Sequence, residues 1–418
     1  MRFLLLLVLL LVITGCASFG KGIAEAFLEK DKDESLQICE IISKGFSGIE
    51  PSVLHEQGKT KLLKIHGVGD HVPGYSTEFL EKLAAELDLS VRNSDYKEIH
   101  LTHPLFPDKN LGVLRIKRLL DEQETKELLF YELTWSEITA QEKAELEYDT
   151  SGEYSYRRAE INGLLKKFSN DTSPDPMLYL GHRHDEILAS FTSAFCWMIS
   201  ADWEGLPDNT NQSCNPFTEQ ALANLEVDDY AFVSHSLGSR ITIDGMQDIA
   251  TKVSDKLEQG NLPDSESQFI EVFRKKQFTV YMLSNQLPLL QMGRHPAEVI
   301  GQEKAYCNAT GDYYKNRIVD KMEVVAFSDP NDLLSYAIPA GFAEKKLDSR
   351  LCIEISNVTV NVADVIDLLG FGKFANPLTA HTAYASNDLV VALIARGIGN
   401  SVTTPMIKEK CKWIRLID

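Results

Sequence analysis

Apolar residues along this chain fall into short continuous runs, separated by longer stretches in which they recur every three or four residues. Short apolar runs bounded by turn-forming residues are typical of buried strands. We therefore expect strands at residues 61–65, 128–135, 228–233, 278–283, 322–327 and 351–360. The three-to-four spacing predicts helices after Ser76, after residue 233 and over residues 384–395. Strands that alternate with helices predict an α/β fold, with a mostly parallel central sheet covered by helices on both faces.

The domain organisation follows from the same pattern. No internal repeat and no Gly/Ser-rich or Pro-rich linker divides the chain, so residues 59–418 are expected to form one domain. The charged stretch from about 136 to 225, with an amphipathic segment at 187–199, predicts a helical insertion before the strand at 228–233. The insertion is either a lid over a pocket or a structural subdomain. Residues 16–58 are expected to be a tether and an irregular lead-in.

The first residues resemble an export signal. Arg2 precedes an apolar run at residues 3–13, which is shorter than the roughly 20 residues that a membrane-spanning helix needs. The run ends in Ile13-Thr14-Gly15-Cys16, which resembles the bacterial lipobox. The resemblance implies cleavage before Cys16 and lipidation of its sulfur, and Ala17 in place of Asp favours the outer membrane, facing the periplasm. An ordinary signal peptide with an incidental cysteine is the alternative.

Charge and cysteine content narrow the classes of function. The chain has 42 basic and 61 acidic residues, which argues against a nucleic-acid-binding protein. Six cysteines remain besides Cys16, and an even number in an exported chain indicates disulfides. The candidate pairs are Cys196–Cys214, Cys307–Cys352 and Cys39–Cys411, although six cysteines allow 15 pairings. No C-x-x-C spacing indicates a zinc site, and we expect neither a metal nor a cofactor.

The strongest chemical motif is Ser234-His235-Ser236-Leu237-Gly238, between the strand at 228–233 and the following helix. A serine hydroxyl becomes a useful nucleophile when a sharp turn presents it beside a base and oxyanion donors. The segment resembles the nucleophile elbow of α/β-hydrolases, with Ser234 in place of the usual first glycine. The resemblance makes Ser236 the nucleophile, whereas His235 is expected to pack or hydrogen-bond. A chance match at a strand end is the alternative.

A second segment, His66-Gly67-Val68-Gly69, follows the first predicted strand. In α/β-hydrolases, the residue after such a His-Gly pair and the residue after the nucleophile donate the two N–H groups of the oxyanion hole. The resemblance therefore assigns these donors to Val68 and Leu237. The alternatives are a simple glycine turn and a phosphate-binding loop, for which the motif is incomplete.

Two later segments supply an acid and a base. The strand at 322–327 runs into Ser328-Asp329-Pro330-Asn331-Asp332, and His381 lies just before the last helix. The resemblance favours Asp332 as the acid that orients the histidine, with Asp329 as the competing choice. His381 fits the base because it comes last, and the order Ser236, Asp332, His381 is the one expected for α/β-hydrolases.

Together these segments resemble the α/β-hydrolase superfamily, most closely lipase- or esterase-like bacterial lipoproteins, over roughly residues 60–400. The resemblance implies a serine hydrolase that cleaves a carboxylic ester, with a small-molecule or lipid acyl ester as substrate and Cys16 as the membrane attachment. Thioester and amide substrates remain open, as does a non-catalytic envelope lipoprotein that uses the fold as a scaffold.

Overall fold

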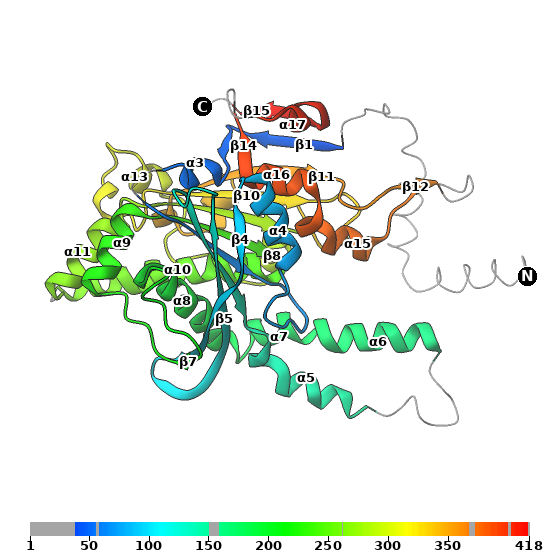
Figure 1. The fold of residues 1–418 in the computed structure, drawn as a ribbon, viewed down its shortest axis with the longest axis horizontal. Coiled ribbons are helices and arrows are strands. Elements are labelled where there is room, and N and C mark those ends of the chain that lie inside the picture. Colours follow the sequence, from blue (N-terminus) through cyan, green and yellow to red (C-terminus); the bar gives the residue numbers. More distant parts are fainter. Residues whose placement is uncertain are drawn as a thin grey trace, which may run out of the picture. The chain divides into compact units, whose positions relative to one another are not determined.

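A sheet of eleven strands lies at the centre of the computed structural model, counted over the described residues 38–55, 58–149, 159–260, 262–367, 373–399 and 403–416 (Figure 1). Contacts divide the chain into Met1–Ile38 and Cys39–Asp418, and the sheet belongs to the second unit. The predicted signal peptide and Cys16 lie outside the described residues. Among the described residues, no helix is both long and apolar enough to cross a bilayer.

The middle of the sheet is parallel. Its order is β11-β10-β9-β8-β3-β6, with every neighbouring pair parallel. The strands are β3 (Thr60–Ile65), β6 (Glu127–Thr134), β8 (Asp229–His235), β9 (Gln277–Leu283), β10 (Lys321–Ser328) and β11 (Ile353–Val360). Each coincides with a predicted strand to within two residues at either end, so the predicted α/β fold with a mostly parallel central sheet is confirmed.

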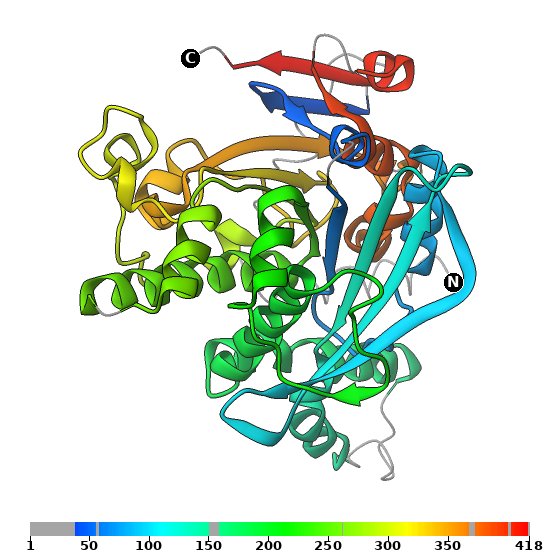
Figure 2. The same cartoon turned by 60° about the vertical axis from the view of Figure 1, so that its left-hand side comes forward.

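One edge of the sheet carries a hairpin that the apolar runs did not predict. β4 (Ser90–His103) and β5 (Phe106–Leu120) pair antiparallel, and β5 pairs antiparallel with β6 (Figure 2). Beyond β4 lies the short β7 (Thr210–Asn211). Charged residues interrupt both long strands, but Ile99 and Leu101 keep the two-residue spacing of a strand with one buried face.

The other edge changes the predicted start of the domain. β1 (Cys39–Ser43) pairs antiparallel with β11 and parallel with β15 (Cys411–Arg415), and a disulfide joins Cys39 to Cys411. The sheet therefore begins at residue 39, whereas the lead-in was predicted to extend to 58. The five-residue strand is too short for a period-two pattern to identify it in the sequence. The other two predicted disulfides, Cys196–Cys214 and Cys307–Cys352, also form.

Helices cover both faces of the sheet. Along β3, Leu62 and Leu63 point to opposite faces and belong to separate apolar cores. The Leu62 side packs against α4 (Thr77–Glu86) and α16 (Asp388–Arg396). The Leu63 side packs against α8 (His184–Ser200) and α10 (Leu237–Gln259), with α9 (Glu219–Val227) and α11 (Asp264–Phe273) outside them.

The predicted insertion is helical but only partly peripheral. It contains α5 (Ala140–Glu147), α6 (Glu160–Thr172) and α7 (Pro174–Leu180) before α8. Helix α8 is a core element, because Phe191 and Phe195 on it are buried against the sheet. The outer pair α5 and α6 extends from one side of the unit in Figure 1. The remaining short elements include α3 (Glu50–Val53), α12 (Leu287–Leu290), β12 (Ile366–Asp367), β13 (Lys373–Phe374), α15 (Pro377–Thr382) and α17 (Pro405–Lys410).

Candidate active site

Ser236 lies in the tight turn between β8 and α10, directly after the strand and at the N-cap of the helix. Its backbone has φ 53° and ψ −121°, a conformation that residues with a side chain rarely adopt. Such strain persists only where the surroundings enforce it, and it is often found at functional sites. The hydroxyl of Ser236 thus sits at the carboxyl end of a central strand, where ligands of parallel sheets bind.

Two glycines allow this turn. A Cβ atom on Gly238 would lie 2.6 Å from the carbonyl oxygen of His66, and one on Gly67 would lie 2.7 Å from Cβ of Ser236. The position two residues before Ser236 tolerates Ser234, whose buried hydroxyl lies 3.3 Å from Ser239 Oγ and 3.4 Å from the carbonyl oxygen of Tyr281. The departure from glycine at 234 therefore does not obstruct the turn.

The predicted oxyanion segment passes directly against Ser236. Gly67 packs on Ser236, so the next residue, Val68, lies beside the turn. Leu237 is the first residue of α10, and the N–H of a first helical residue is not used inside its own helix. Both predicted donors are thus brought to the same strand end as the Ser236 hydroxyl.

A network of buried polar side chains holds the backbone that follows Val68. The N–H of Gly69 donates to the fully buried carboxylate of Asp175 at 2.7 Å, and Thr139 donates to the same carboxylate at 2.7 Å. The ammonium of Lys143 lies 2.9 Å from both Asp175 and Asp70. The backbone after Val68 is therefore held by a charged group that water does not reach.

His66 is part of the same framework. Its Nδ1 donates to the carbonyl of Gly67 at 2.8 Å, and its Nε2 accepts from the N–H of Trp135 at 3.1 Å. The ring stacks between His71 and Trp135, and burial holds the pKa of His66 well below its usual value. This histidine is neutral and has both nitrogens occupied, so it fixes the loop's shape.

The structure brings Asp332 and His381 together. Asp332 follows β10, His381 lies on α15, and Oδ1 of Asp332 accepts from Nδ1 of His381 at 2.9 Å. Burial alone would raise the pKa of Asp332, but the hydrogen bond and charge interaction with His381, together with hydrogen bonds from Ser284 and the N–H of Leu334, lower it. Because Nδ1 faces this carboxylate, the neutral ring carries its proton on Nδ1 and leaves Nε2 as an acceptor.

The competing carboxylate, Asp329, serves a loop instead. Its Oδ2 accepts from the N–H groups of Val362 and Ala363 at 2.6 and 3.1 Å, and its Oδ1 accepts from the N–H of Asn331 at 2.7 Å. Asp329 thus ties the end of β10 to the chain that leaves β11, whereas Asp332 contacts the imidazole.

Sequence reasoning missed Ser284. This residue follows β9 directly, with φ 49°, and its Oγ donates to Oδ2 of Asp332 at 2.7 Å while lying 2.9 Å from Nδ1 of His381. Tyr384 adds a hydrogen bond from its hydroxyl to Asp332 at 3.2 Å. The position of Ser284 in the sequence could have identified it, because a serine directly after a predicted parallel strand lies at the same end of the sheet as the other candidate residues.

His235 connects the serine turn to the histidine. Its Nε2 donates to the carbonyl oxygen of His381 at 2.8 Å, and its ring lies 5.3 Å from the His381 ring. Burial, followed by repulsion from His381, lowers the pKa of His235 to about 3. His235 therefore stays neutral and holds the backbone of His381, as its predicted packing role implies.

Two atoms at this edge are buried and unpaired. Among the residues that the structure describes, neither Oγ of Ser236 nor Nε2 of His381 has a hydrogen-bond partner. Buried polar groups are usually paired, so an unpaired donor and acceptor at one strand end call for an explanation. A hydroxyl, a base with a free nitrogen and two backbone donors are the groups that acyl transfer requires.

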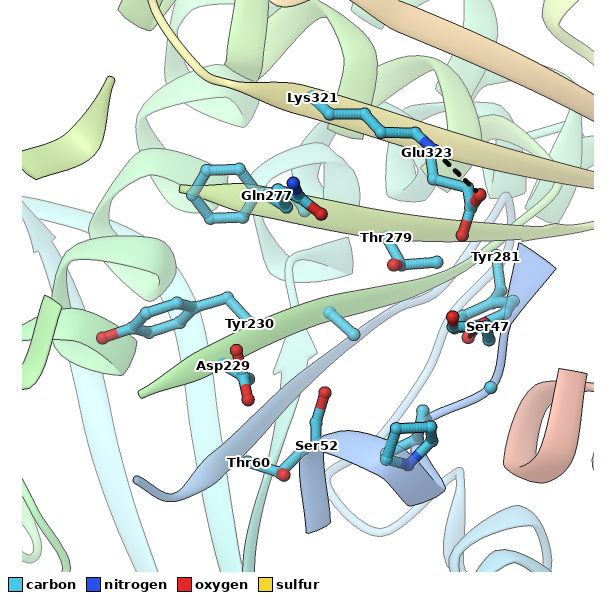
Figure 3. Close-up of a pocket in the computed structure, with 15 residues that line it drawn as sticks. Ser47, Ser52, Thr60, Asp229, Tyr230, Gln277, Thr279, Tyr281, Lys321 and Glu323 are labelled. Atoms are coloured by element: carbon cyan, nitrogen blue, oxygen red, sulfur yellow. Dashed lines mark hydrogen bonds and ion pairs between the residues drawn. The ribbon is translucent and has the colours of Figure 1, made fainter. Parts of the chain in front are cut away.

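A separate polar pocket of about 230 Å³ lies at the opposite edge (Figure 3). Asp229, Gln277 and Lys321, the first residues of β8, β9 and β10, line it together with Glu323. Because these are the amino ends of the parallel strands, this pocket is distinct from the edge that carries Ser236.

Comparison with known proteins finds no match to a family model, to a curated protein or to a solved structure. The candidate site consequently rests on the chain's own geometry. Its central feature is the meeting of the Ser236 turn, the His66–Val68 segment and the Asp332–His381 pair at one edge of the sheet.

Proposed function

We propose that this chain is a serine hydrolase of the α/β-hydrolase type, which cleaves a carboxylic ester through an acyl-enzyme on Ser236. The observation that carries the proposal is the strained Ser236 turn at the same sheet edge as the hydrogen-bonded pair of Asp332 and His381. The order β3, β8, β10 of the segments that bear the oxyanion loop, the serine and the acid supports it. The hairpin β4–β5, inserted in the chain between β3 and β6, departs from the expected alternation of strands and helices. In the sheet it lies beyond β6, away from β8 and β10.

The first half of the reaction forms the acyl-enzyme. Nε2 of His381 takes the proton of the Ser236 hydroxyl while Oγ attacks the ester carbonyl carbon. The carbonyl oxygen becomes an oxyanion, which the N–H groups of Val68 and Leu237 stabilise. When the tetrahedral intermediate collapses, the bond to the alcohol oxygen breaks and His381 returns the proton to the leaving alcohol.

The second half releases the acid. A water molecule gives a proton to His381 and attacks the acyl carbonyl carbon, and the bond to Ser236 Oγ then breaks with return of the proton to the serine. Asp332 stabilises the imidazolium formed in both halves without itself taking the proton. The lowered pKa of Asp332, with His381 as the partner that lowers it against burial, supports this role.

The location of this activity is part of the proposal. Lipidation of Cys16 in the lipobox-like segment would attach the enzyme to a bacterial envelope membrane, most simply the outer membrane facing the periplasm. The three disulfides among the described residues support an exported protein, because disulfides persist in oxidising compartments.

Labelling with a fluorophosphonate probe tests the nucleophile. The full chain should react, Ser236→Ala should abolish the reaction, and His381→Ala should slow it by at least a hundredfold. Ser239→Ala is the matched control, since Ser239 is buried one turn later in α10 and should leave labelling intact.

The competing function is a non-catalytic lipoprotein with the same fold. It predicts a folded chain that neither reacts with the probe nor hydrolyses any of a series of acyl esters. That result, or equal labelling of the Ser236→Ala variant, would overturn the proposal. Parallel rates on matched ester, thioester and amide substrates would identify the bond that the enzyme cleaves.

A further inference from the structure

Large apolar side chains are exposed around the edge that carries Ser236. Val72 follows the His66–Val68 segment, Leu333 adjoins Asp332, and both are 73% exposed. We call the wider set the apolar rim, and its members on described residues are Val72, Leu164, Leu165, Phe168, Leu333, Leu334, Ile366, Phe374 and Leu378. All of them belong to connections that follow the carboxyl end of a parallel strand, namely β3, β6, β10 or β11.

Helix α6 supplies the most concentrated part of the rim. Leu164, Leu165 and Phe168 lie within two turns of the helix, and Leu164 is 71% exposed. Lys166 and Lys167 lie between them, also exposed. An apolar face bordered by lysines is typical of helices that lie in a membrane interface, where the lysine stems reach back to the headgroups.

Helix α6 is attached to the candidate oxyanion loop. The N–H of Asp70 donates to Asp171, near the end of α6, at 3.2 Å, and Asp171 and Thr172 lie within 4 Å of a Cβ built on Gly69. In Figure 1, α6 lies on the same side of the unit as α15, which carries His381. The C-terminal end of α6 is therefore attached to the loop that follows Val68, and its exposed apolar face continues outward from that loop.

Exposing the apolar side chains of the rim to water is energetically unfavourable. Burying large apolar side chains away from water is favourable, and monomeric proteins rarely leave such side chains gathered in one region. The rim therefore indicates a contact surface, and its occupant follows from where the chain enters the folded unit.

The folded unit begins at the same end of the sheet as the rim. Because β1 runs antiparallel to β11, Cys39 pairs with Val360, the last residue of β11, and so begins at the carboxyl edge. The 23 peptide units from Cys16 to Cys39 span at most about 80 Å. A lipid on Cys16 would thus connect to the edge that also bears Ser236 and the rim.

We infer that the apolar rim docks on the lipid bilayer to which the chain is attached, with the Ser236 edge facing the lipid. The substrate class is then an ester carried in the membrane. This substrate assignment rests on the proposed function, whereas the docking itself requires no catalysis.

Tryptophan quenching by brominated phospholipids measures the contact directly. The full chain is bound to phosphatidylcholine vesicles, with Leu165→Trp or Leu333→Trp as the reporter. Leu257→Trp is the control, because Leu257 is exposed near the far end of α10, away from the Ser236 edge. The control shares the same anchor, so attachment through Cys16 alone does not distinguish it from the two reporters.

Docking predicts that the added tryptophan is quenched at least twofold more at positions 165 and 333 than at position 257. Equal quenching at all three would overturn the inference. The inference would also be overturned if, in the absence of lipid, the tryptophan at position 165 became shielded from water as the protein concentration rose. The rim would then contact a second copy of the chain.

Hydrolysis tests the substrate assignment separately. The triple variant Leu164→Ser, Leu165→Ser and Phe168→Ser should lose at least tenfold in rate on an ester embedded in vesicles, yet keep its rate on a short soluble ester. An unchanged rate on the embedded ester would overturn the assignment. If the parent hydrolyses neither ester, the proposed function fails, and the quenching result still decides whether the rim docks.

Discussion

Asparagine substitutions at Asp332 and Asp329 should have different effects, the first mainly on activity and the second mainly on stability. Both aspartates follow β10 and both are buried, but only Asp332 contacts His381, at 2.9 Å. In Asp332→Asn the amide keeps the shape of the carboxylate and loses its charge. The imidazolium formed during the reaction then loses its stabilising partner, and the preference for a proton on Nδ1 weakens.

The size of the Asp332→Asn effect follows from this geometry. Two unit charges centred about 4 Å apart at an effective dielectric constant of about 20 interact by roughly 4 kcal/mol. Because each 1.36 kcal/mol of barrier is tenfold in rate, this loss corresponds to about 10³-fold, and the disturbed tautomer adds to it. We therefore expect kcat to fall by about 10³- to 10⁴-fold, with KM little changed.

Asp329→Asn should instead lower stability. Its carboxylate accepts from the N–H groups of Val362, Ala363 and Asn331, and an amide turned either way points its NH₂ group at one of these donors. Leaving buried donors unpaired costs about 1–3 kcal/mol each, so we expect a loss of about 2–4 kcal/mol. Below the unfolding transition, kcat should stay within about tenfold of the parent value.

Steady-state hydrolysis of a chromogenic short-chain ester and urea unfolding of both variants measure these effects. A full loss of activity in folded Asp329→Asn, with Asp332→Asn active, would refute the assignment of the acid. Equal destabilisation of the two variants, with equal activity, would refute the division of roles between them.

Three further predictions concern the surroundings of Ser236. Ser284→Ala removes the 2.7 Å hydrogen bond to Asp332, and should lower kcat/KM about tenfold and stability by about 1 kcal/mol, as judged by urea unfolding. Gly67→Ala places a Cβ 2.7 Å from Cβ of Ser236 and should lower kcat by about 10²-fold, whereas Gly163→Ala, with nothing within 4 Å of its Cβ, should not. His235 has a folded pKa of about 3, below the unfolded value of 6.5, so its contribution to stability is present above pH 6.5 and declines as the pH falls toward 3. Urea unfolding from pH 7 to 4 should show a slope of up to about 1.4 kcal/mol per pH unit from this residue, and an unchanged slope in His235→Asn would refute its neutral burial.

Much of the fold could be predicted from the sequence, because parallel strands buried on both faces are continuous apolar runs. The strands β3, β6, β8, β9 and β10 are buried along most of their length, and Leu62 and Leu63 of β3 face separate cores, whereas β11 alternates between buried and partly exposed residues. The hairpin and the edge strands do not form such runs, because edge strands are short or partly solvated. The edge strand β1 is also far from its partner in the sequence, since Cys39 pairs with Val360, more than 300 residues away.

In the candidate site, too, the local features could be predicted from the sequence and the long-range contacts could not. The strand-to-helix turn at Ser236 depends on small neighbours within a few residues, so the sequence by itself determined where it would form. Which of Asp332 and Asp329 contacts His381, and the presence of Ser284 beside that contact, depend on which side chains of different strands meet at one edge. Contacts of this kind leave no local pattern, because each carboxylate has the same neighbours in sequence whichever partner it finds. Only the tertiary structure decided them, by setting the strand order that brings the ends of β9 and β10 to α15.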